Sequence, residues 1–160
     1  MGRPDVALAV ASAHALSLIR TDDWPMLAAE LIDLGFDGDA LVALAGMPKS
    51  ITGWELDELR PSVMDEIGAH EMPVEGAGDV VARLLAANLR RPFIRSLATL
   101  APSLDYPGGA LGAAYSLSEY LDCDCHPKGE QEARDFERKT AEAGPLNVPE
   151  ALALALVGYM

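Results

Sequence analysis

The sequence is poor in aromatic residues. They make up 6% of the 160 residues, although half of all residues are apolar. Alanine and leucine dominate the apolar half, and both are strong helix formers, whereas strands are enriched in aromatic and β-branched residues. We therefore predict an all-α protein, a compact irregular bundle of seven or eight helices that forms a single domain over residues 1–160.

Cysteine and histidine are also scarce, with two cysteines and three histidines in the chain. Both cysteines lie in YLDCDCHPKGE, residues 120–130, next to His126. A tetrahedral zinc site needs four nitrogen or sulfur ligands, usually as two separated pairs, and the sequence has no second pair. A disulfide between Cys123 and Cys125 would be strained and reducible. We predict a polar turn between two helices, with no metal and no cofactor; the alternative is that Cys123, Cys125 and His126 bind a transition metal or react with oxidants.

The sequence lacks the motifs that mark the common enzyme classes. It has no glycine-rich phosphate loop, no Gly-x-Ser-x-Gly elbow, no HExxH zinc motif and no EF-hand loop. DLGFDGDA, which contains Asp33, Asp37 and Asp39, resembles part of a calcium loop, but its spacing is wrong and the closing glutamate is missing. The sequence therefore favours a protein without enzymatic activity.

The two ends of the chain are apolar, but no apolar run is long enough to cross a bilayer. The N-terminal segment MGRPDVALAVASAHALSLIR offers small residues to a signal peptidase, but Asp5 and His14 interrupt the run that a signal peptide requires. We therefore expect a cytoplasmic protein whose first helix spans residues 6–19. The C-terminal residues 152–160 either complete the core or form a homodimer interface.

Apolar spacing and capping residues divide the rest of the chain into helices. Thr52 followed by Glu55 predicts a capping box at the start of the segment 51–68, and Pro61 predicts one kinked helix or two short ones there. We expect residues 69–78 to form a loop. The expected core positions of the segment 51–68 are Trp54, Leu56, Leu59, Val63 and Ile67.

Cations are scarce and unevenly placed. Lysine and arginine together number 12, against 25 aspartates and glutamates, for a net charge of −13. So negative a surface repels phosphate groups, which argues against binding to nucleic acid or to a membrane surface and is compatible with a basic protein partner. Residues 1–75 hold 14 of the acids, whereas residues 76–104 hold four arginines and one acid.

Aromatic residues lie among the acids of the first half. Charge that steers a basic protein toward a surface, together with an aromatic side chain that the contact buries, is typical of a protein-binding site. The predicted partner-binding residues are Asp22, Asp23, Trp24, Asp33, Phe36, Asp37 and Asp39. The alternative is that the aromatic side chains point into the core and the acids only solvate the outer face.

The arginine-bearing segment allows two interpretations. If residues 79–100 form a continuous helix, a condition that Pro92 puts in question, its arginines fall near one face. They are Arg83, Arg90, Arg91 and Arg95. The favoured interpretation is that they pair with carboxylates of neighbouring helices, and the alternative is a small anion-binding pocket.

LAAELIDLGFDGDALVALAGMP, followed by WELDELRPSVMDEIG, resembles a pattern found in short, uncharacterised helical proteins of actinobacteria. The resemblance covers residues 22–68 and implies a helical fold, with no activity attached to it. The matching features are Trp24, Leu27–Leu34, Gly35-Phe36-Asp37, Ala40-Leu41, Leu44-Ala45-Gly46, Pro48 and Glu58-Leu59. Small acidic proteins of this kind are similar in character to immunity proteins. The sequence therefore predicts a non-enzymatic, acidic protein-binding domain; masking of a basic partner, as by an immunity or antitoxin-like factor, is one form of that function.

Overall fold

The structure is a computed structural model that describes residues 2–88, 93–122, 128–144 and 146–157. Within these ranges the chain forms nine α-helices and no strand, so the prediction of an all-α fold is confirmed, with slightly more helices than expected. The helices are α1 (Arg3–Ala15), α2 (Trp24–Asp33), α3 (Asp39–Ala45), α4 (Gly53–Ile67), α5 (Val74–Asn88), α6 (Ile94–Ala98), α7 (Gly109–Asp122), α8 (Gly129–Glu142) and α9 (Glu150–Val157). None of these helices has both the length and the hydrophobicity that a membrane span requires.

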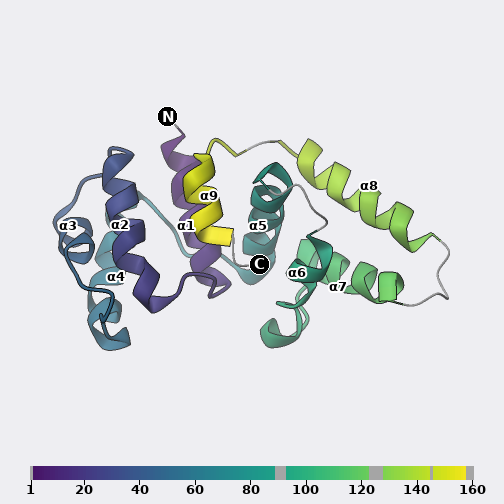
Figure 1. The fold of residues 1–160 in the computed structure, drawn as a ribbon, viewed down its shortest axis with the longest axis horizontal. Helices are drawn as coiled ribbons and strands as arrows, with labels where there is room; N and C mark the ends of the chain where they lie inside the picture. Colours follow the sequence, from purple (N-terminus) through teal and green to yellow (C-terminus); the bar gives the residue numbers. More distant parts are fainter. Residues whose placement is uncertain (1, 89–92, 123–127, 145, 158–160) are drawn as a thin grey trace.

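Three groups of helices follow one another along the molecule (Figure 1). Helices α2, α3 and α4 form one end, α6, α7 and α8 form the other, and α1, α5 and α9 lie between them. Helix α1 is buried on most of its sides, and Val6, Ala9, Val10 and Ala13 are fully shielded from solvent. Its small side chains let neighbouring helices approach closely, so α1 forms the centre of the core.

Helix α9 completes this core. Its residues Leu152, Ala153, Leu156 and Val157 are buried, and the helix contacts α1, α2 and α5. The C-terminal segment was expected either to complete the core or to form a homodimer interface, and α9 completes the core. Residues 158–160 lie outside the described ranges.

Two helix boundaries differ from those predicted. Helix α1 starts three residues earlier and ends four residues earlier than the segment 6–19. Helix α5 begins at Val74, so the second half of the predicted loop 69–78 is helical instead. Gly78 lies in this helical part, where α5 packs closely against α7. A Cβ atom at Gly78 would lie 2.6 Å from the Cγ atom of Leu111 in α7. The glycine permits close packing of the two helices.

Helix α4 is a single helix that runs through Pro61. Its predicted capping box is confirmed, because the Thr52 hydroxyl accepts a hydrogen bond from the Glu55 N–H (3.2 Å) and the Glu55 carboxylate accepts one from the Thr52 N–H (2.8 Å). Gly68 ends the helix with a φ of 73°, a left-handed conformation that favours glycine.

Some acidic side chains fasten one helix to the start of another segment. The carboxylate of Glu66 in α4 accepts hydrogen bonds from the backbone N–H groups of Ala40 (2.9 Å) and Leu41 (2.8 Å), in the first turn of α3. The carboxylate of Asp5 in α1 accepts one from the N–H of Asn147 (2.7 Å), which precedes α9. These carboxylates satisfy backbone donors that lack partners within their own helix or segment.

The start of α7 is held in the same way by α5. The Asp79 carboxylate accepts a hydrogen bond from the Ala110 N–H (2.8 Å), and the Glu75 carboxylate accepts one from the Gly108 N–H (3.2 Å). A negative charge is also favourable near a helix N-terminus because it opposes the positive end of the helix dipole. Part of the acidic excess therefore serves the fold.

Candidate functional site at the acidic end of the bundle

Carboxylates without a partner gather on α2, α3, α4 and the adjoining loops. Within the described residues the following side chains have neither a hydrogen bond nor an ion pair: Asp23, Glu30, Asp33, Asp37, Asp39, Glu58, Asp65 and Glu71. Asp22 differs, because it pairs with Arg20 at 3.4 Å. Among the predicted partner-binding aspartates, all except Asp22 therefore have side chains without an internal hydrogen bond or ion pair.

The two aromatic residues predicted to bind a partner are not on the surface. Trp24 is 1% exposed and Phe36 is 6% exposed, so both side chains point inward, as the alternative interpretation expects, and neither presents a surface to a partner in this structure. Trp24 lies three and seven residues before Leu27 and Leu31, which places all three on the buried stripe of α2. That spacing was readable from the sequence.

Trp54 shows the opposite error. It was expected in the core, yet its side chain is 71% exposed, the most exposed of the large hydrophobic residues in the described ranges. An α-helix turns about 100° per residue, so a residue two positions before the buried Leu56 faces away from the core. The same outer face carries Glu58 and Asp65, four and eleven residues after Trp54. An exposed tryptophan thus shares one helix face with two free carboxylates.

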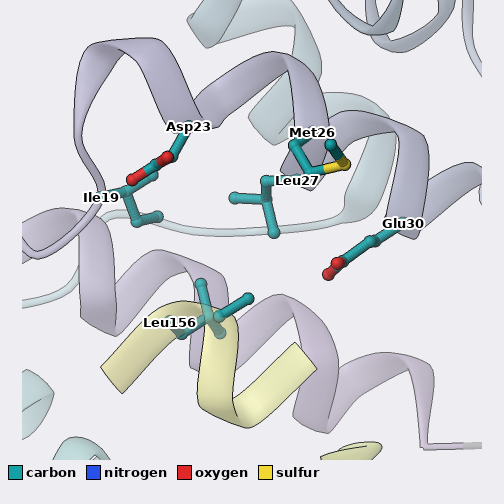
Figure 2. Close-up of a pocket in the computed structure, with 7 residues that line it drawn as sticks. Ile19, Asp23, Met26, Leu27, Glu30 and Leu156 are labelled. Carbon is teal, nitrogen blue, oxygen red and sulfur yellow. The ribbon is translucent and has the colours of Figure 1, made fainter. Parts of the chain in front are cut away.

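A groove lies between α2 and α9 (Figure 2). Its volume is about 90 Å³. It is lined by Ile19, Asp23, Met26, Leu27, Glu30, Ala155 and Leu156. Figure 2 shows Leu27 of α2 and Leu156 of α9 pointing toward each other, while the carboxylate of Glu30 points into the space between the helices. Asp23 lies at the other end of the groove, beside Ile19.

Glu30 is the least satisfied acid of this groove. Its Oε2 atom is shielded from solvent, and no described group donates a hydrogen bond to it. Buried carboxylate oxygens normally have a donor, because removing a charged oxygen from water without one is costly. At the rim of the groove, Met26 is 57% exposed, so an apolar side chain meets solvent directly beside this carboxylate.

A histidine that sequence reasoning left aside packs beneath the acidic end. His14 of α1 lies edge-on to Trp24, with 5.7 Å between the ring centroids. The guanidinium of Arg60 lies 6.0 Å from the centroid of Trp24 and donates a hydrogen bond to Asp57 (2.6 Å). Burial lowers the pKa of His14, the positive charge of Arg60 lowers it further, and Asp57 opposes the shift. The cluster favours the neutral form of the imidazole and ties α1, α2 and α4 together.

The described arginines of the segment 79–100 have separate partners. Arg83 donates two hydrogen bonds to the carbonyl oxygen of Gly144, after the C-terminus of α8 (3.1 and 2.8 Å). Arg95 pairs with Asp122 at 2.7 Å. The pairing interpretation holds for Arg95, whereas Arg83 binds a backbone carbonyl rather than a carboxylate. Arg90 and Arg91 lie outside the described residues.

A second pocket, between α6, α7 and α8, has mixed charge. It is lined by Arg95, Leu121, Glu130, Ala133, Arg134 and Glu137. Burial raises the pKa of Glu137, and a hydrogen bond from the Phe93 backbone N–H partly offsets this. Because two arginines and two glutamates line it, this pocket does not select an anion or a cation by charge.

Comparisons with known proteins add no relative. No protein-family model matches the chain, and neither the curated proteins nor the solved structures provided a match. The cysteine turn with Cys123, Cys125 and His126 lies outside the described residues, and the described part of the chain contains no group of three histidine, cysteine or acidic residues that could hold a metal ion. The acidic end is therefore the candidate site, and its groups can attract and bind a cation.

Proposed function

We propose that the protein is a non-enzymatic recognition domain whose acidic end binds a basic surface of a partner protein. The observation that carries the proposal is Trp54, which is 71% exposed on the helix face that also carries Glu58 and Asp65. Exposure of so large an apolar side chain is unfavourable in water, and tryptophan is enriched among the residues that dominate binding energy. A partner that buries Trp54 would gain affinity from it.

The free carboxylates supply the attraction at long range. The arginines of this end are engaged internally: Arg3 donates to the Gly35 carbonyl (2.6 Å), and Arg60 pairs with Asp57 (2.6 Å). Residues 1–75 hold 14 acids against four lysines and arginines, so the summed field of this end stays negative, attracts a basic protein and speeds its association. Masking of a basic surface, as immunity or antitoxin-like factors achieve it, is the form of recognition that we propose.

Affinity capture with matched variants tests the proposal. The immobilised protein is exposed to lysate of the native host, and captured proteins are identified by mass spectrometry. We expect a basic protein that Trp54→Ala no longer captures and that Tyr106→Ala still captures. Tyr106 is a matched control, because it is 60% exposed but precedes α7 at the opposite end of the molecule.

Association kinetics with the captured protein test the electrostatic part. Asp33→Lys with Asp37→Lys reverses two exposed, unpaired charges and should slow association at least about tenfold at low salt. The salt dependence of the association rate should become shallower in the same variant. An acidic partner would refute the proposed function. So would a partner that binds Trp54→Ala and the Asp33→Lys, Asp37→Lys variant as well as it binds the unmodified protein.

A further inference from the structure

The groove between α2 and α9 has the size of one side chain. Its volume of about 90 Å³ is well below the roughly 300–1,000 Å³ typical of pockets for small-molecule ligands. Leu27 and Leu156 face each other at its floor and are 4% and 1% exposed, while the accessible apolar walls are Met26, which is 57% exposed, and Ala155. A long unbranched apolar chain matches these walls.

The polar groups of the groove are both carboxylates. Glu30 points into the space between the helices, and its Oε2 atom lacks a donor among the described residues. Asp23 immediately precedes α2, seven residues before Glu30, and lies at the other end of the groove beside Ile19. The groove therefore combines an apolar channel with one carboxylate at each end.

We propose that this groove binds a lysine side chain of the partner protein. The methylene stem lies against Met26 and Ala155, above the floor that Leu27 and Leu156 form, and the ammonium group pairs with Glu30. Lysine fits better than arginine, because its charge is compact and sits at the end of a four-carbon stem, whereas the guanidinium is a wide planar fork. Asp23 strengthens the negative potential at the other end. The inference rests on the proposed function for the positive charge of the partner.

A lysine analogue tests the groove without the partner. Heteronuclear NMR spectra of the full chain are recorded with increasing concentrations of acetyl-lysine methylamide. We expect saturable shifts of backbone amides in α2 and α9. The norleucine analogue, which has the same stem without the ammonium group, should bind at least about tenfold more weakly, because it cannot pair with the carboxylate.

Two substitutions on α2 distinguish binding by the groove carboxylate from attraction by the overall negative charge. Glu30→Gln should weaken binding of the lysine analogue at least about tenfold, while Asp33→Asn, which removes an exposed charge that does not line the groove, should leave it unchanged. The spectra themselves report whether each variant is folded. Equal binding of the norleucine analogue, equal binding to Glu30→Gln, or shifts spread outside α2 and α9 would each overturn the inference.

The outcome is distinguishable from that of the proposed function. Trp54 does not line the groove, so Trp54→Ala should bind the lysine analogue normally even though it loses the partner. If the lysine analogue does not bind but partner capture still depends on Trp54, the lysine site in the groove is refuted and the proposed function stands. If the lysine analogue binds in the groove but partner capture depends neither on Trp54 nor on the free acids, the proposed function is refuted and the lysine site stands.

Discussion

Removal of the Glu66 carboxylate should destabilise the acidic end from within. Its oxygens accept hydrogen bonds from the N–H groups of Ala40 (2.9 Å) and Leu41 (2.8 Å), so α4 caps α3 across a gap of some 25 residues in sequence. A side chain at Gly38 would collide with this carboxylate, which explains the glycine before α3. The substitution Glu66→Ala removes both acceptors.

The expected loss follows from the geometry. Two hydrogen bonds to a charged acceptor would contribute about 3–6 kcal/mol if they were fully buried. The site is only partly buried, so water replaces some of what is lost. Loss of a helix N-cap, at about 0.5–2 kcal/mol, and loss of a favourable dipole contact, at about 0.3–1 kcal/mol, are closer comparisons. We expect about 2 kcal/mol, which corresponds to a fall in Tm of roughly 4–8 °C for a chain of this length.

Urea unfolding followed by circular dichroism measures this loss. Glu58→Ala on the outer face of the same helix is the control, because its carboxylate is exposed and has no described partner; it should change stability by less than about 0.5 kcal/mol. Glu66→Gln keeps one acceptor oxygen and should lie between the two. If Glu66→Ala is no more destabilising than Glu58→Ala, the capping role of Glu66 is wrong.

Two further stability predictions follow from the packing. The fold lowers the pKa of His14 below its ordinary value of about 6.5. As the pH falls through about 6.5, the unfolded chain therefore binds a proton before the folded chain does, and the free energy of unfolding decreases. The substitution His14→Gln should reduce the difference in urea midpoint between about pH 7.5 and pH 5.5. If the midpoint of His14→Gln changes with pH as much as that of the unmodified protein, His14 is not the source of the pH dependence. Gly78→Ala forces a Cβ atom onto Leu111 and should cost about 1–3 kcal/mol, whereas Gly53→Ala, with open space around it, should be neutral or slightly stabilising in the same urea assay. Equal effects of the two alanines would contradict the close contact of α5 with α7.

The sequence predicted the helices better than it predicted the roles of single residues. The α class and the capping box of α4 depend on neighbours a few residues apart, and such patterns can be read directly. Trp54 could also have been placed correctly, because its distance from Leu56 puts it on the outer face. Glu66 could not, because the backbone groups that it caps lie far away in sequence and meet it only after folding.

The groove between α2 and α9 was equally beyond prediction. Asp23 was among the predicted partner-binding residues, but for its charge and its nearness to Trp24 rather than for the groove that it lines. Leu156 lies more than a hundred residues later in the chain, and the sequence gives no signal that connects it with Leu27. A long-range helix contact therefore decides which acids of α2 lie beside an apolar channel.

The acids of this chain divide by what they contact, and this division explains the low number of cations. Carboxylates such as Glu66 and Asp79 are stabilised by backbone N–H groups and need no lysine or arginine. Free carboxylates such as Asp33 and Asp37 repel one another, and that repulsion opposes the compact state. Among the described cations of this end, Arg20 and Arg60 pair with aspartates and Arg3 binds a backbone carbonyl, which leaves Lys49 without a hydrogen bond or ion pair. Cations from outside the chain would relieve this repulsion, and under the proposed function a basic partner protein would supply them.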